Sequence, residues 1–92
     1  YGHAGDGNVH LHPICVNMGK EEWAQKLPHL MSDIYHAGVS FCGAISGEHG
    51  IGSLKKAYLP IQMEDSFLNV LRAVQKAFDP TNILNPGKVF DF

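Results

Sequence analysis

The sequence has few cysteines, no excess of positive charge and no long apolar run. Cys15 and Cys42 are its two cysteines, and because neither belongs to a CxxC pair we expect buried, reduced thiols in an intracellular protein. Seven basic and nine acidic residues give a net charge of −2, which offers no positive field to nucleic acid or to an anionic membrane. No apolar stretch approaches the ~20 residues of a membrane span, and no signal-peptide pattern is present. We therefore expect a cytoplasmic protein that binds no nucleic acid, with membrane association through partners left open.

The length of 92 residues allows one small domain with a modest core. A chain of this size buries roughly 60–65% of the surface that its unfolded form exposes, so its stability margin is thin. The first residue is a tyrosine, and a turn-rich motif begins at once. We interpret the sequence as part of a longer protein.

The first twelve residues hold three histidines, one aspartate and three glycines. Asp6 and Gly7 favour a turn, because glycine accepts a positive φ and aspartate bonds nearby backbone. The segment 8–12 then alternates polar and apolar residues, which predicts a strand with one buried face. The polar face of this strand carries Asn8, His10 and His12. His3 can be carried back to the same place by the turn, and converging imidazoles are a common metal-binding arrangement.

The middle of the chain predicts a helix followed by a second strand. Acidic residues after position 20 favour a helix start, and Pro28 either kinks this helix or lies in its first turn. The apolar stripe expected to form core is Trp23, Leu27, Leu30, Met31 and Ile34. Gly38 is the expected C-cap. The small apolar residues 39–46 then predict a strand, bulged at Gly43. The helix also carries two histidines that we interpret as surface residues, His29 and His36.

The segment 47–52, with the sequence GEHGIG, places Glu48 and His49 between glycines. Such spacing allows a sharp turn and lets a ligand approach the backbone. Two readings stay open from these residues alone. The histidines and the carboxylate either form a metal or acid–base site, or they cap turns and pair with one another on a solvated loop.

The last third predicts a helical turn or a short helix over 53–58, stopped at Leu59 and Pro60, and a clearer helix after it. The apolar face of the second helix is Phe67, Leu68, Leu71, Val74 and Phe78. Asp65 or Ser66 is expected to cap its start, and Asp79 followed by proline to end it. The tail closes with two residues that either form an edge strand or dock on the core, Val89 and Phe90. The element order predicts an α+β fold whose two strands are too few for a stable sheet.

Three blocks of the sequence, at 3–10, 47–52 and 78–88, resemble the C-terminal domain of FAD-linked oxidases. Within that family they are most similar to the D-2-hydroxyacid branch, which includes the FAD-binding subunit of glycolate oxidase, D-lactate dehydrogenase and D-2-hydroxyglutarate dehydrogenase. The family has an N-terminal FAD-binding domain and a ferredoxin-like α+β substrate domain. The resemblance implies that residues 1–92 are the C-terminal half of that substrate domain, with antiparallel strands, helices on one face and no FAD-binding domain of their own.

The resemblance also implies roles for single residues. His3, His10 and Glu48 match the ligands of a divalent metal, usually zinc, and His49 matches the proposed base. Where D-2-hydroxyglutarate dehydrogenases carry an asparagine that touches substrate, this chain has His12. The remaining candidates are Asn8 with His12 for substrate, and Asn85 with Lys88 for the flavin side of the domain interface.

The function implied is oxidation of a D-2-hydroxyacid of glycolate or D-lactate type by a flavin enzyme that uses a metal to help deprotonate the hydroxyl. We expect FAD held mainly by an upstream domain, partner subunits that transfer electrons, and a homo-oligomer for the isolated piece. Two alternatives from other classes stay open. One is a non-catalytic metal-binding or oligomerisation module, and the other is a metallohydrolase using the same histidines.

Overall fold

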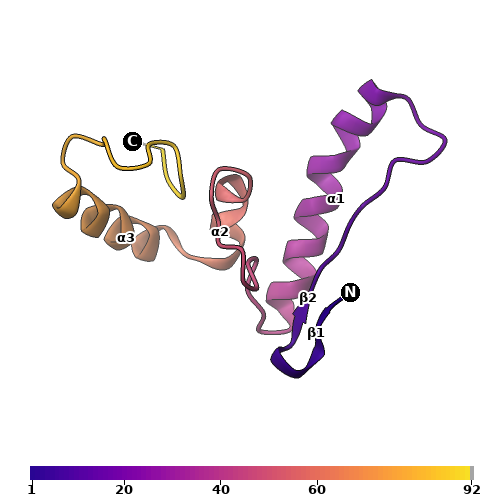
Figure 1. Ribbon diagram of the computed structural model, residues 1–92, viewed down its shortest axis with the longest axis horizontal. Coiled ribbons are helices and arrows are strands. Elements are labelled where there is room, and N and C mark those ends of the chain that lie inside the picture. Colours follow the sequence, from indigo (N-terminus) through magenta and orange to yellow (C-terminus); the bar gives the residue numbers. More distant parts are fainter. Residues whose placement is uncertain (92) are drawn as a thin grey trace.

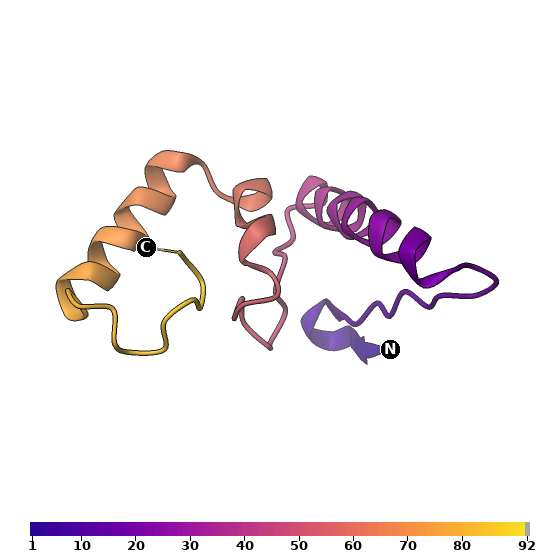
Figure 2. The ribbon, with the colours of Figure 1, turned by 90° about the horizontal axis from the view of Figure 1, so that it is seen from above.

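The computed structural model describes residues 1–91 and combines a small antiparallel sheet with helices, which confirms the α+β class (Figure 1). The elements in chain order are β1 (Gly2–His3), η1 (Ala4–Asp6), β2 (Asn8–Val9), α1 (Lys20–Ser40), η2 (Lys56–Tyr58), α2 (Leu59–Gln62) and α3 (Asp65–Phe78). The radius of gyration is 15.5 Å, whereas a compact chain of this length would have ~12 Å. Figures 1 and 2 show the reason: the hairpin and α1 lie on one side of α2, and α3 with the tail lies on the other.

The N-terminal hairpin forms where the turn signals predict it. Gly7 has a φ of 69° and donates to the Ala4 carbonyl at 3.2 Å, and the strands pair with Gly2 opposite Val9. Gly2 has to be glycine, because a Cβ there would lie 2.1 Å from the Asn8 carbonyl oxygen. The predicted strand over 8–12 is only partly correct. It stops after Val9, because β1 is two residues long and offers no further ladder partner.

Helix α1 runs straight through Pro28, so the helix does not begin there. The predicted strand over 39–46 is wrong: α1 continues to Ser40, and none of the following residues to 46 is a strand. A Schellman motif ends the helix, with Gly43 donating to the Gly38 carbonyl at 2.9 Å and Cys42 to Val39 at 2.9 Å. Local hydrogen bonds thus overrode β-propensity. The predicted C-cap at Gly38 is three residues early, since the cap position is Phe41.

The C-terminal half differs from expectation at its helix starts. Leu59 and Pro60 begin α2 instead of stopping a helix, because the missing N–H of proline falls where helix donors are unpaired anyway. The N-cap position of α3 is Glu64, one residue before the predicted caps, and no side chain bonds there. The predicted end of α3 at Asp79 is confirmed. The Asp79 carboxylate is buried and accepts the amides of Ile83 and Leu84 at 3.0 and 2.8 Å.

The core is small. Its buried apolar residues are Ile45, Leu59, Leu68 and Phe90. Phe90 therefore docks on the core as one of the two expected outcomes, and no strand forms there within residues 1–91. The predicted core stripe of α1 is at most half-buried, because nothing within residues 1–91 covers it as a second layer. The prediction of buried thiols is also wrong, since Cys15 and Cys42 are both exposed and free.

A broad groove of about 1630 Å³ lies between the N-terminal segment, α1 and the loop that follows α1. Four residues of the α1 stripe line it, Trp23, Leu27, Met31 and Ile34, as do residues of the GEHGIG segment, whereas Leu30 is exposed and does not. The fold thus brings the two motif-bearing segments to one open surface. Among residues 1–91, no helix combines the length and the apolar character needed to cross a membrane.

Candidate functional site

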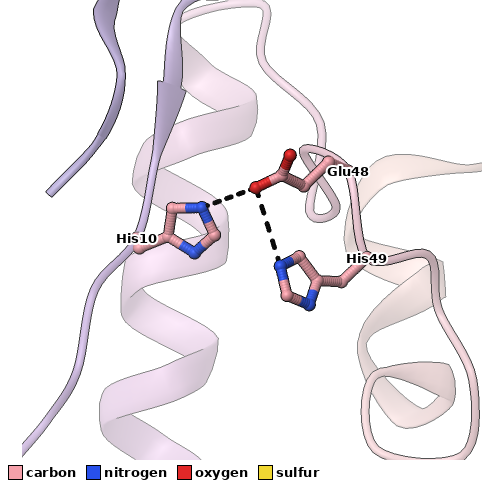
Figure 3. Close-up of side chains that lie close together, drawn as sticks. All are labelled: His10, Glu48 and His49. Atoms are coloured by element: carbon pink, nitrogen blue, oxygen red, sulfur yellow. Dashed lines mark hydrogen bonds and ion pairs between the residues drawn. The ribbon is translucent and has the colours of Figure 1, made fainter.

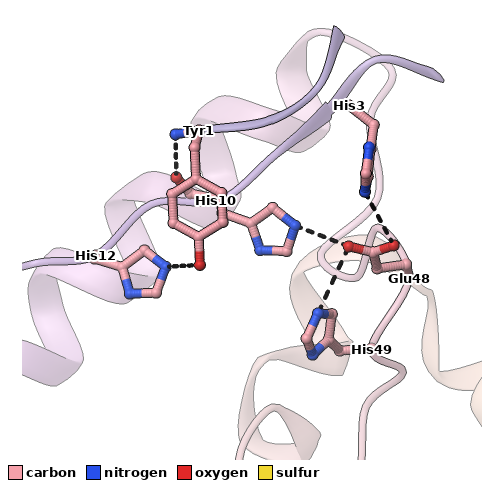
Figure 4. Close-up of polar contacts among 6 residues, drawn as sticks. All are labelled: Tyr1, His3, His10, His12, Glu48 and His49. Carbon is pink, nitrogen blue, oxygen red and sulfur yellow. Dashed lines mark hydrogen bonds and ion pairs between the residues drawn. The ribbon is translucent and has the colours of Figure 1, made fainter. Parts of the chain in front are cut away.

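The Glu48 carboxylate is the centre of the site, and three imidazoles approach it (Figures 3 and 4). The Nε2 atom of His10 donates a hydrogen bond to Glu48 Oε1 at 2.8 Å. Nε2 of His49 lies 3.6 Å from the same oxygen, and Nε2 of His3 lies 3.7 Å from Oε2. Residues 38 positions apart in sequence therefore share one polar contact.

The backbone explains why these side chains meet. His3 ends β1 and His10 directly follows β2, so the hairpin presents both from neighbouring strands. Glu48 and His49 come from the loop after α1, which turns with positive φ at Gly50 and Gly52. Gly47 lets this loop reach the hairpin, because a Cβ at that position would lie 2.0 Å from the Asn8 Oδ1.

The site is open to solvent, with one exception. The side chains of His3 and His49 are 62% and 71% exposed, and Glu48 is 44% exposed. His10 is only 18% exposed. Contacts between charged groups at such an exposed site contribute little to stability, typically ~0–1 kcal/mol. The cluster is therefore not explained as a device that holds the fold together.

The histidines of the N-terminal segment differ in their distance from the group formed with Glu48, which the sequence did not show. His10, Glu48 and His49 each offer a ligand atom within 4.8 Å of one another. His3 approaches Glu48 from the other side of the carboxylate and lies outside this group of three (Figure 4). His12 points instead at Tyr1, whose hydroxyl lies 2.9 Å from His12 Nε2. It contributes no nitrogen to the group of three.

These donors suit a zinc ion. Imidazole nitrogens and a carboxylate oxygen are the ligands of catalytic zinc, and two ligands on a tetrahedral ion lie ~3.4 Å apart. The His49–Glu48 and His3–Glu48 distances of 3.6 and 3.7 Å are close to that value, while the 2.8 Å of His10 is a hydrogen-bond distance. Binding would therefore have to release the proton that His10 donates to Glu48, as metal binding to histidine generally does.

The other predicted residues are more scattered. Asn8 lies against Gly47 at the edge of the groove, and Lys88 also lines the groove. Asn85 has a φ of 51° in the C-terminal tail and does not line that groove. The two histidines on α1 interpreted as surface residues, His29 and His36, are exposed.

The sequence reasoning missed the part played by Tyr1. The aromatic ring stacks on both His10 and His12, with ring centroids 4.8 and 5.1 Å apart. The position of Tyr1 could have been derived from the hairpin. Given the turn at Gly7, the hairpin register that pairs Gly2 with Val9 places Tyr1 opposite His10.

An α+β unit that gathers imidazoles around one carboxylate at an open groove carries a donor set of the kind that catalytic metal sites use. The particular family is given by comparison with known proteins. Residues 1–89 match the family described as FAD linked oxidases, C-terminal domain, and the chain belongs to that family.

Three relatives illustrate the similarity. The chain is 45% identical over 89 residues to a D-lactate dehydrogenase of Archaeoglobus fulgidus, covering 97% of this chain and 19% of that protein. It is 38% identical over 91 residues to the glycolate oxidase subunit GlcD of Bacillus subtilis (98% and 19%). It is 36% identical over 91 residues to a D-2-hydroxyglutarate dehydrogenase of Stutzerimonas stutzeri (98% and 20%). The chain thus spans about a fifth of the length of these relatives.

Proposed function

We propose that this chain is the C-terminal part of the substrate domain of a flavin-dependent enzyme that oxidises a D-2-hydroxyacid of glycolate or D-lactate type to the 2-oxoacid. Family membership over residues 1–89 supports this proposal, together with relatives whose names describe oxidation of such acids. The observation that carries it is the convergence of His3, His10 and His49 on Glu48. The proposal includes an upstream FAD-binding domain and a ferredoxin-like fold for the complete substrate domain.

The reaction removes a hydride from Cα of the acid and a proton from its hydroxyl. FAD would accept the hydride, and a zinc ion would lower the pKa of the hydroxyl. His3, His10 and Glu48 would hold the ion. His49 is the proposed base: its imidazole is exposed and its Nε2 lies 3.6 Å from the carboxylate of Glu48, beside the place where the substrate hydroxyl would bind.

The surrounding residues have proposed roles in binding. Asn8 and His12 lie on the same segment as His10, and we propose that their polar side chains bind the carboxylate of a substrate. Lys88 lines the same groove and brings a positive charge toward an anionic substrate or flavin. Asn85 is proposed to face the flavin domain. Electron-transfer partners and a cytoplasmic location also belong to this proposal.

The test uses the full-length protein with His10→Ala, matched by His29→Ala as a control on an exposed histidine of α1. The His10 variant should lose bound zinc and D-2-hydroxyacid turnover together, because it removes the best-covered donor of the site. The His29 variant should keep both. Zinc content by elemental analysis and turnover against a panel of D- and L-2-hydroxyacids provide the readouts. Retained turnover in the His10 variant would contradict the proposed metal site, and absence of turnover in the unmutated protein would contradict the proposed reaction.

A further inference from the structure

The side chain of Tyr1 makes three contacts with the two histidines that follow β2 (Figure 4). Its ring is nearly parallel to that of His10, at an angle of 7° and a centroid distance of 4.8 Å. It also stacks on His12 at 5.1 Å and 18°. The hydroxyl completes the set with its 2.9 Å hydrogen bond to His12 Nε2.

From these contacts we propose that Tyr1 is a positioning residue that aims His10 at Glu48 and holds His12 away from the cluster. The proposal rests on the metal site proposed above. It assigns Tyr1 no contact with substrate or with the ion, and it acts through the two histidines.

The case for His10 rests on rotational freedom. The His10 amide donates to the Tyr1 carbonyl at 2.7 Å, so the hairpin backbone fixes the two residues opposite each other. The parallel ring then restricts the imidazole to the plane in which Nε2 points at Glu48 Oε1. Aromatic side chains that face each other across neighbouring strands attract one another in this way. The stack also accounts for why His10 is the least exposed histidine of the site.

The case for His12 rests on competition for its nitrogen. Residues two apart on an extended segment point to the same side, so both imidazoles lie on the side that carries Glu48. The hydroxyl of Tyr1 occupies Nε2 of His12, and His12 lies outside the group formed by His10, Glu48 and His49. Tyr1 thus makes one histidine a ligand and its neighbour a non-ligand.

The consequence is a selective effect on metal binding. Groups that orient metal ligands from outside typically change metal affinity by 10–100-fold when they are replaced. Tyr1 is 84% exposed and is not among the residues packed on the core, so its replacement should leave folding intact.

The experiment measures zinc affinity of the full-length protein by competition with a chromophoric chelator, independently of turnover. Tyr1→Leu removes the stack and the hydroxyl, and should weaken zinc binding by about 10–100-fold. Tyr1→Phe loses the hydroxyl but keeps the ring stacks on both His10 and His12, so it should retain the zinc affinity of the unmutated protein. His12→Ala should also leave zinc affinity unchanged. Flavin content and melting temperature identify any variant that has failed to fold.

Different failures point to different errors. If the unmutated protein binds no zinc, the proposed function has lost its metal and the inference falls with it. If zinc binds but Tyr1→Leu binds it equally well, only the positioning role is overturned. If His12→Ala weakens binding as strongly as His10→Ala, then His12 is a ligand and the proposed separation is wrong. That last arm holds even where the Tyr1→Leu variant fails to fold.

Discussion

Replacing His49 by asparagine separates a base from a metal ligand, which sequence similarity cannot do. Asparagine keeps a polar side chain of similar reach but cannot accept the proton. The imidazole is 71% exposed, so its loss leaves no cavity and the expected effect is chemical rather than structural. A general base typically contributes 10²–10⁴-fold, which at 1.36 kcal/mol for each factor of ten corresponds to ~2.7–5.4 kcal/mol of barrier.

The assay is anaerobic stopped-flow reduction of the bound flavin by substrate in the full-length protein. The variant should keep its flavin and most of its metal while reduction slows by ~10²–10⁴-fold. The loss should fall on kcat rather than KM, because proton removal is felt in the transition state. His36→Asn, on the exposed side of α1, is the matched control and should reduce its flavin at the normal rate.

Two results would refute this reasoning in different ways. Reduction at the unmutated rate would show that His49 is not the base, and His12 would be the next candidate. Loss of zinc from the variant would show that His49 is a ligand. This second outcome has to be tested, because His10, Glu48 and His49 offer ligand atoms within 4.8 Å of one another. His3→Asn would then be the variant that tests the base.

Three further predictions concern the loop, the partly buried phenol of Tyr35 and the isolated chain. Gly47→Ala places a Cβ 2.0 Å from Asn8 Oδ1, so the Asn8 side chain or the loop has to shift. The variant should lower the melting temperature slightly and weaken zinc binding, whereas Gly5→Ala, with no atom within 4 Å of the added Cβ, should do neither. Burial, with a smaller contribution from Tyr58, raises the pKa of Tyr35 above its ordinary 10.0. The unfolded state therefore loses this proton at a lower pH than the folded state, and the free energy of unfolding should fall as pH rises above 10.0. In Tyr35→Phe this fall should be smaller. The 92-residue chain alone should bind no FAD, oxidise no hydroxyacid and self-associate, because large apolar side chains such as Leu54 are as much as 88% exposed.

Each of these has a contrary result. Equal melting temperatures for the two glycine variants would show that the loop can shift without cost. A pH profile unaffected by Tyr35→Phe would place the alkaline loss elsewhere. A monomer by light scattering at high concentration would contradict self-association of the chain.

Features that depend on a few neighbouring residues could be predicted without coordinates. The turn at Gly7 and the end of α3 at Asp79 follow from backbone preferences of a few residues, and both are where they were predicted. The family blocks likewise identified the residues that now surround Glu48. The error at 39–46 has the same origin, because those residues are β-prone but no strand of residues 1–91 pairs with them, and the helix-ending hydrogen bonds of Gly43 and Cys42 prevailed.

Which of the candidate side chains meet depends on contacts between distant parts of the chain. Contact between His10 and Glu48 spans 38 positions and depends on where α1 ends, on the hairpin register and on the lack of a Cβ at Gly47. None of these distances is encoded in a local pattern. The same holds for His12, which the alternation of the strand places beside His10 but which a hydrogen bond to Tyr1 directs away from the cluster. The residue types can be read from the sequence and show which groups could bind a metal or transfer a proton. Long-range packing determines which of these groups contact one another.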